Sequence, residues 1–263
     1  MRVGITLPLF NDDAHLPITV ARRAEEAGLD GVFAFDHLWP LRQPHRPAMH
    51  STTVLAAVAA ETSRVHVGTL VARVGLVPDE ILVHNLRTLG RIAGDRLIAG
   101  LGTGDSANKD ENLAYGIDFA PVAVRRASLI ACCRDLRAAG IRTWIGGRSR
   151  SVRQAAVEAP ADGWNGWCPD AATFGAEAAD LAGTAVEVTW AGQVLIGADL
   201  DEAHAKLTRY GGRSGLLWGT PDDLQRHFDA LEAVGATWAV CAPLDVTDPA
   251  VPETLALVAA ARR

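Results

Sequence analysis

A regular alternation of short apolar runs with amphipathic stretches is the feature that most constrains how this chain can fold. Apolar runs of strand length occupy residues 3–7, 31–35, 65–71 and 96–101, and helix-like stretches separate them at 14–27, 51–62 and 79–93. Alternation of this kind is typical of parallel strand–helix–strand units of about 30 residues each. We therefore expect successive right-handed crossovers within one parallel sheet.

The same alternation continues through the rest of the sequence. Strand-like runs follow at 142–146, 162–165, 186–196 and 237–241, and helical stretches at 121–139, 149–159, 199–210, 219–234 and 249–262. Eight strands with intervening helices predict a (β/α)8 TIM barrel, and the 263 residues suit the roughly 250 that such a barrel needs. We expect a single domain over residues 1–263. A doubly wound open sheet is the alternative, because the pattern alone does not show closure.

Local signals refine three of these helices. Gly28 is expected to end the first helix in the left-handed conformation, and Ser51 is a candidate N-cap for the second. The periodicity of the third helix predicts a buried face. Its members are Ile81, Leu82, Leu86, Leu89 and Ile92.

Composition narrows the classes of function. The net charge of −6 argues against a nucleic-acid-binding surface. The four cysteines form no Cys-x-x-Cys pair, and His45 and His50 lie in a proline-containing loop without helical ligand spacing, so we expect no disulfide framework and no metal site. No apolar stretch suits a signal peptide or a membrane span, which favours a cytoplasmic protein without a membrane partner. Most tryptophans are expected in the core, namely Trp164, Trp167, Trp190, Trp218 and Trp238.

The pair Asp36-His37 follows the second predicted strand directly. In a barrel, functional side chains lie on the loops after the strands. Histidine is the side chain best suited to move protons near neutral pH, and an adjacent aspartate can hold the loop by accepting hydrogen bonds from backbone amides. The alternative is that Asp36 only caps a turn and His37 is an ordinary surface residue.

A glycine-rich segment over residues 100–108 follows the fourth predicted strand. Its glycines let a ligand approach the backbone closely. The segment lacks the Gly-x-Gly-x-x-Gly spacing of dinucleotide-binding proteins and the Gly-Lys-Ser/Thr of phosphate-binding P-loops. It is thus either a site of another kind or an ordinary tight turn.

Residues 146–149, Gly146-Gly147-Arg148-Ser149, follow the fifth predicted strand and lead into a helix. Free backbone N–H groups, the positive end of the helix dipole and a guanidinium group all favour a phosphate. The alternative is a hydroxyl-capped helix start with solvated arginines. The residues alone support both interpretations equally.

Taken in order, several short segments resemble the bacterial-luciferase-like superfamily, and within it the oxidoreductases that use the deazaflavin coenzyme F420. The matching segments are Glu25-Glu26-Ala27-Gly28-Leu29-Asp30-Gly31, Asp36-His37, Val67-Gly68-Thr69, Asp95 to Gly104, Ile145-Gly146-Gly147, Ala161-Asp162-Gly163-Trp164 and Trp218-Gly219-Thr220-Pro221. The fold of that superfamily is a TIM barrel, so the resemblance favours the closed barrel over the open sheet.

The resemblance also implies roles for individual residues. It places His37, with Asp36, at the reacting face of the deazaflavin ring, and Asp105 where relatives carry an acidic residue that exchanges a proton. Further cofactor contacts are implied for Leu70, Val71, Thr103, Gly104, Asn108, Gly146, Gly147, Arg148 and Ser149. The last four would hold the phosphate, and Leu70-Val71 matches a strand end that relatives build with a non-proline cis peptide bond.

The sequence departs from its relatives in two ways. Residues 118–141 hold little more than one helix where many relatives carry a long insertion that covers the substrate, so the pocket is either more open or completed by a partner subunit. Asp105 is one methylene shorter than the glutamate of some relatives, which puts its catalytic role in doubt.

The function that the resemblance implies is hydride transfer between coenzyme F420 and a small organic substrate. His37 or Asp105 would handle the accompanying proton. An FMN-dependent luciferase-like monooxygenase is the first alternative, and a barrel that binds a flavin or deazaflavin without turnover is the second. Family analogy implies a homodimer. Residues 38–50, 73–78 and 167–185 are expected to shape the substrate pocket.

Overall fold

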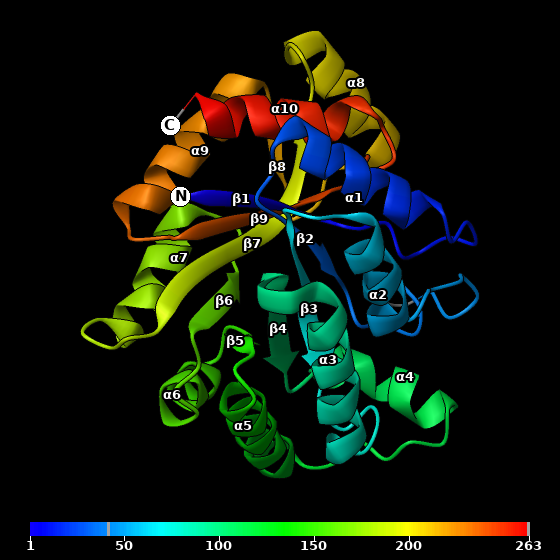
Figure 1. The fold of residues 1–263 in the computed structure, drawn as a ribbon. Coiled ribbons are helices and arrows are strands. Elements are labelled where there is room, and N and C mark those ends of the chain that lie inside the picture. The colour runs from blue at the N-terminus through cyan, green and yellow to red at the C-terminus, as the bar shows by residue number, and fades with distance from the viewer. Residues whose placement is uncertain (41–42, 262–263) are drawn as a thin grey trace.

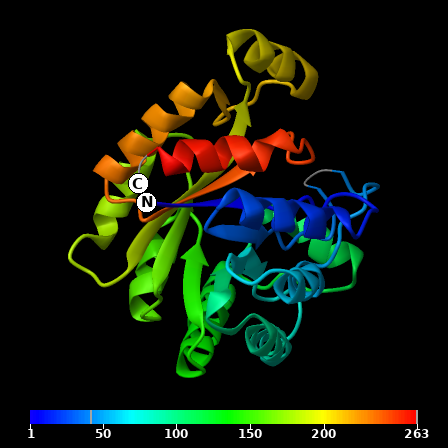
Figure 2. The same ribbon diagram turned by 45° about the horizontal axis from the view of Figure 1, so that its top comes forward.

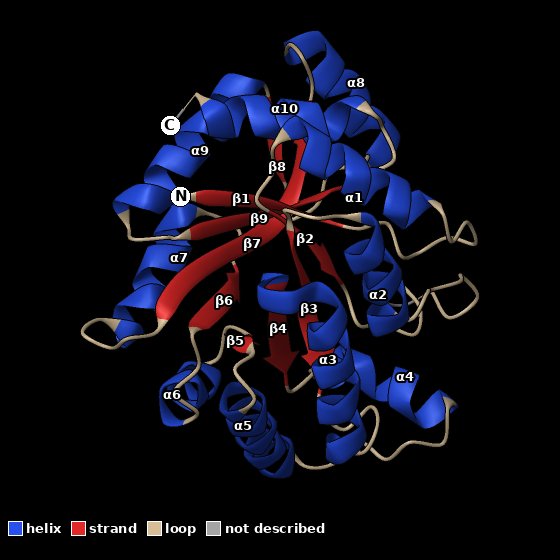
Figure 3. Ribbon diagram, in the orientation of Figure 1, coloured by secondary structure: helices blue, strands red, loops and turns tan. Residues whose placement is uncertain are grey.

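Eight parallel strands close into a barrel in the computed structural model, which describes residues 1–40 and 43–261 (Figures 1 and 3). Around the barrel they are β1 (Arg2–Thr6), β2 (Gly31–Ala34), β3 (His66–Arg73), β4 (Leu97–Gly102), β5 (Arg142–Gly146), β6 (Gly163–Trp167), β7 (Glu187–Ile196) and β9 (Trp238–Pro243). The pairings of β6 with β7 and of β9 with β1 complete the ring. The predicted TIM barrel is confirmed, and the open sheet is excluded.

Helices cover the outside of the barrel (Figure 2). They are α1 (Leu16–Ala27), α2 (Ser51–Glu61), α3 (Asp79–Ala93), α4 (Lys109–Ala114), α5 (Val122–Ala138), α6 (Arg150–Glu158), α7 (Ala171–Ala178), α8 (Leu200–Tyr210), α9 (Pro221–Ala233) and α10 (Ala250–Ala260). A short strand, β8 (Leu217–Gly219), pairs in parallel with the last residues of β7. Short 3-10 turns lie at Gly94–Arg96, Ser106–Asn108 and Ala179–Leu181. The sequence pattern did not predict β8, α4 or α7.

The local predictions have mixed outcomes. Gly28 ends α1 with φ of 93°, as expected. Ser51 is not the N-cap of α2: it is the first helical residue, and its hydroxyl donates to Asp36 instead. The prediction that Ile81 and Ile92 belong to the buried face of α3 is wrong, because they are 48% and 46% exposed.

Two apolar layers fill the molecule. Inside the barrel, Phe33 packs between Trp144 and Trp238 with ring centroids 5.5 and 5.8 Å away. Between the strands and the helices lies the larger layer, which includes Trp164 and Trp190. The prediction that all five tryptophans lie in the core is wrong for Trp167 and Trp218, which are 38% and 37% exposed.

No helix within residues 1–40 and 43–261 combines the length and the apolar character that crossing a membrane requires. The four cysteines are free and buried, as expected from their irregular spacing.

Candidate active site

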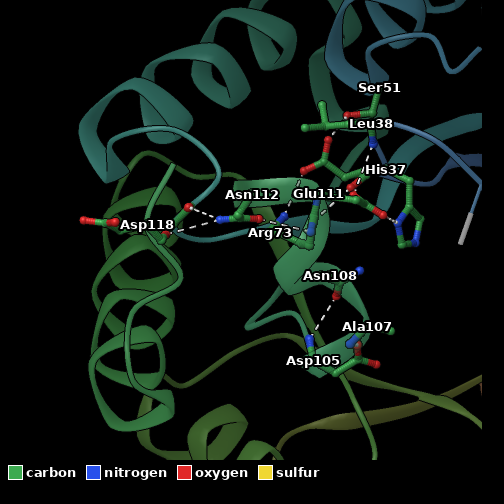
Figure 4. Close-up of polar contacts among 12 residues, drawn as sticks. His37, Leu38, Ser51, Arg73, Asp105, Ala107, Asn108, Glu111, Asn112 and Asp118 are labelled. Carbon is green, nitrogen blue, oxygen red and sulfur yellow. Dashed lines mark hydrogen bonds and ion pairs between the residues drawn. The ribbon is translucent and has the colours of Figure 1, made fainter. Parts of the chain in front are cut away.

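His37 lies just beyond β2, and the buried carboxylate of Glu111 holds its ring (Figure 4). The distance from His37 Nδ1 to Glu111 Oε1 is 2.9 Å. The His37 side chain is 21% exposed, whereas that of Glu111 is fully buried. One edge of the imidazole is thus fixed by the protein and the other is accessible.

Glu111 comes from α4 and accepts two further hydrogen bonds. Arg73, at the end of β3, donates from Nη2 to Oε2 over 2.6 Å, and the Leu38 amide donates to the same oxygen over 3.2 Å. Burial acts to raise the pKa of Glu111, but the hydrogen bond and charge of His37 and the charge of Arg73 outweigh it and lower that pKa below its ordinary value. The residue is therefore a carboxylate that can only accept hydrogen bonds.

Asp36 fixes the loop that carries His37. Its Oδ1 accepts from the hydroxyl of Ser51 over 2.8 Å, and its Oδ2 accepts from the amide of Arg73 over 2.9 Å. Arg73 Nε also donates to the carbonyl of Asp36 over 3.1 Å. The loop-holding role expected of Asp36 is confirmed, because Asp36 ties the loop to the end of β3 and to the start of α2.

Asp105 and Asn108 form a separate turn after β4 (Figure 4). Asp105 Oδ1 accepts from the Ala107 amide over 2.8 Å, and Asn108 Oδ1 accepts from the Asp105 amide over 2.9 Å. Asp105 is exposed and Asn108 is buried. A Cβ on Gly104, whose φ is 65°, would lie 3.2 Å from Asn108 Oδ1 and 3.3 Å from Arg73 Cδ. This glycine therefore lets the turn pack against the Arg73–Glu111 pair.

The Leu70-Val71 peptide bond is cis, as the resemblance implied. Leu70 is 6% exposed inside the barrel, and Val71 is half-buried. The Val71 side chain lies against Gly102 and Gly146: a Cβ there would approach its γ-carbons to 2.4 and 2.6 Å. Glycine at both positions is thus explained by the inward-pointing valine.

The start of α6 holds the predicted anion site. Ser149 caps the helix, accepting from the Val152 amide over 3.3 Å, and the Gly147 carbonyl accepts from Trp164 Nε1 over 2.7 Å. Arg148 is exposed but also ion-paired: its Nε and Nη2 donate to Glu177 Oε1 over 3.0 and 2.6 Å, and hydrogen bonding to Glu177 raises its pKa. The capped helix is confirmed, while phosphate binding stays a prediction.

Residues 1–136 match the model of the family described as luciferase-like monooxygenase. The chain belongs to this family. F420-dependent glucose-6-phosphate dehydrogenase from Kineococcus radiotolerans is 38% identical over 118 residues, which are 44% of this chain and 34% of that protein. The enzyme of the same name from Beutenbergia cavernae is 34% identical over 137 residues, or 51% of this chain and 40% of the relative. The matches thus span well under half the length of these relatives.

Solved structures of low sequence identity share the fold of this luciferase-like chain. An F420-dependent secondary alcohol dehydrogenase in complex with an F420–acetone adduct superposes with a TM-score of 0.81 at 14% identity, covering 100% of this chain and 99% of the other. The coenzyme F420 dependent tetrahydromethanopterin reductase from Methanopyrus kandleri gives 0.76 at 17% identity, covering 97% of both chains. Monooxygenase RslO1 from Streptomyces bottropensis gives 0.78 at 16% identity, covering 100% and 99%.

The sequence analysis gave no individual role to two residues at the centre of this candidate site, Arg73 and Glu111, although it expected residues 73–78 to shape the substrate pocket. Arg73 lies beyond the strand predicted to end at residue 71. Glu111 lies on the six-residue α4, which is too short to show a helical period. The one local feature that points to Glu111 is its position three residues after Asn108, behind the glycine-rich end of a predicted strand.

We expect Gly102→Ala to destabilise the luciferase-like barrel by about 1–3 kcal/mol, because the added methyl overlaps Val71. Urea unfolding measures this. The same change made in a Val71→Ala background should cost less, since the overlapping γ-carbons are gone. Gly212→Ala is the control, as its Cβ would find its nearest neighbour at 3.7 Å. An equal cost in both backgrounds would show that the valine is not the cause.

Proposed function

We propose that this chain is an oxidoreductase that transfers a hydride between coenzyme F420 and a small organic substrate. The observation that carries the proposal is the His37–Glu111–Arg73 network at the carboxyl ends of β2, β3 and β4, where barrel enzymes hold their active sites. The F420-dependent relatives support the choice of cofactor.

The residues around the mouth of the barrel fit a ring with a phosphate-bearing tail. We propose contacts from the half-buried Asp36, Val71, Thr103 and Gly104 and from the more buried Leu70 and Asn108 to the ring system. For the phosphate we propose Gly146, Gly147, Arg148 and Ser149 at the N-terminus of α6, where Arg148 and Ser149 are exposed. When bound there, the deazaflavin supplies the centre that accepts or donates the hydride.

His37 is proposed as the group that gives or takes the proton. Because the Glu111 carboxylate can only accept, the hydrogen on this contact belongs to His37 Nδ1. In the neutral imidazole, Nε2 then carries the free lone pair. Asp105 is the second candidate; its Oδ1 is engaged with the Ala107 amide, and the carboxylate is exposed.

A side-by-side titration of the purified chain with oxidised F420 and with FMN tests the cofactor. We expect F420 to bind with a Kd in the micromolar range, and FMN to bind at least tenfold more weakly, a difference of about 1.4 kcal/mol. Tighter binding of FMN would favour a flavin-dependent monooxygenase. If neither binds at micromolar concentration, the proposed function fails.

We also propose that the chain forms a homodimer. The exposed isoleucines of α3, Ile81 and Ile92, support this, because burial of large exposed apolar side chains favours association with a partner. Sedimentation equilibrium of the wild type and of an Ile81→Glu/Ile92→Glu variant tests it: we expect a dimer mass for the first and a monomer mass for the second. A monomeric wild type contradicts the proposal.

A further inference from the structure

Three aromatic side chains meet across the mouth of the barrel. Phe10 follows β1, Phe35 follows β2 and Trp167 ends β6. The rings of Phe10 and Phe35 are stacked with centroids 6.2 Å apart, and Trp167 meets Phe35 edge-on at 5.7 Å. In the barrel order, β2 and β6 lie on opposite sides. Phe35 and Trp167 therefore reach toward each other over the barrel axis.

This aromatic cluster, Phe10, Phe35 and Trp167, adjoins the ring of His37. The His37 ring centroid lies 6.2 Å from that of Phe10 and 6.4 Å from that of Phe35. Trp167 is 38% exposed, and both phenylalanines are half-buried. Buried core aromatics of this barrel, such as Trp144, are fully enclosed. The cluster therefore keeps ring surface available beside the proposed proton-handling residue.

We propose that the aromatic cluster is the substrate subsite and that it selects a planar, uncharged ring compound whose carbonyl or conjugated double bond lies beside His37. The inference rests on the proposed function and names its substrate class. Aromatic rings contact one another offset or edge-to-face with centroids roughly 4.5–7 Å apart. Phe10, Phe35 and Trp167 already meet at such distances, so a flat ring would bind against the accessible ring surface of the cluster. A flexible polyhydroxylated substrate would gain less from these faces.

The charged side chains at the same end of the barrel also favour an uncharged substrate. Arg73 is paired with Glu111 at 2.6 Å, and Lys206 is paired with the buried Asp245 at 2.7 Å. Arg125 donates from Nε to the carbonyl of Thr103 over 2.8 Å. These three cations already have partners within the protein, and an uncharged ring needs none of them in order to bind.

Calorimetric titration of the protein with 1-indanone, and separately with glucose 6-phosphate, tests the proposal with and without saturating oxidised F420. In the wild type we expect 1-indanone to bind and glucose 6-phosphate to bind at least tenfold more weakly. We expect Trp167→Ala to raise the Kd for 1-indanone about tenfold and Trp167→Phe to raise it less than threefold. Trp218→Ala is the matched control, because Trp218 is equally exposed at 37% but packs on His204 away from the cluster.

Three results would overturn the proposal. The first is glucose 6-phosphate binding as tightly as 1-indanone, and the second is an unchanged Kd for 1-indanone in Trp167→Ala. The third is a loss of F420 affinity in Trp167→Ala as large as the loss for 1-indanone, which would assign the rings to the cofactor. The F420 titration of the wild type tests a different claim. If F420 does not bind, the proposed function is wrong. Binding of 1-indanone that depends on Trp167 would still support the subsite in that case.

Discussion

Replacing His37 by alanine is expected to lower kcat by about 10²–10⁴-fold, the usual contribution of a positioned acid or base. The Kd for F420 should change less than about twofold, a difference well below 1 kcal/mol, because the loop itself is held by Asp36 through Ser51 and Arg73 rather than by the imidazole. Stopped-flow absorbance of the deazaflavin measures the rate, and equilibrium titration measures the affinity.

Added imidazole gives the His37→Ala experiment a readout that a merely structural loss would not produce. The His37 side chain is 21% exposed and rests against the fixed acceptor Glu111. The space that alanine leaves is thus open to solvent and still lined by Glu111. Free imidazole should restore part of the rate in a saturable manner. His84→Ala, on the exposed face of α3, should retain the wild-type rate.

The variant Asp105→Asn tests whether His37 or Asp105 transfers the proton. Asparagine can still accept the Ala107 amide hydrogen, so the turn after β4 should persist. If His37 carries the proton, this variant keeps most of its activity. A large loss in Asp105→Asn together with normal turnover in His37→Ala would reverse the assignment.

The barrel itself was predictable because its signals are local. Short stretches of neighbouring residues show the periodicity of each strand and helix. They also show the glycines that end helices, such as Gly28, and the regular spacing of the units. Errors arose where a contact from elsewhere in the chain overrode a local rule. Ser51 has the chemistry of an N-cap, but Asp36, from the loop after β2, binds its hydroxyl.

The site was only half predictable for the same reason. Its position at the strand ends follows from the fold, and His37 and Asp36 follow directly after a recognisable strand. Glu111 is 74 residues from His37, on a helix too short to show a pattern, and Arg73 lies past the expected end of β3. Their role depends on three strand ends meeting in space, which no local window contains. The cis bond at Leu70-Val71 came from the family resemblance alone.

Removing Glu111 is expected to have the largest effect on stability. Glu111→Ala leaves the guanidinium of Arg73 buried without its carboxylate, and breaking a buried pair in this way costs about 3–5 kcal/mol. Glu111→Gln should cost less, because the amide oxygen can still accept a hydrogen bond from Arg73 or His37. Urea unfolding at neutral pH measures both. Asp110→Asn, at the exposed neighbouring position, is the control and should change the unfolding free energy by less than about 0.5 kcal/mol.

The pH dependence distinguishes a charge effect from lost packing. The pKa of Glu111 is lower in the folded chain than its ordinary value of 4.5, so its carboxylate stabilises the fold above that value. This contribution is lost as the pH falls through the folded pKa. The free-energy difference between wild type and Glu111→Gln should therefore shrink as the pH falls below about 4.5. A difference that stays constant as the pH is lowered well below 4.5 would mean that Glu111 acts through shape, and its charge would then have no part in holding Arg73 and His37.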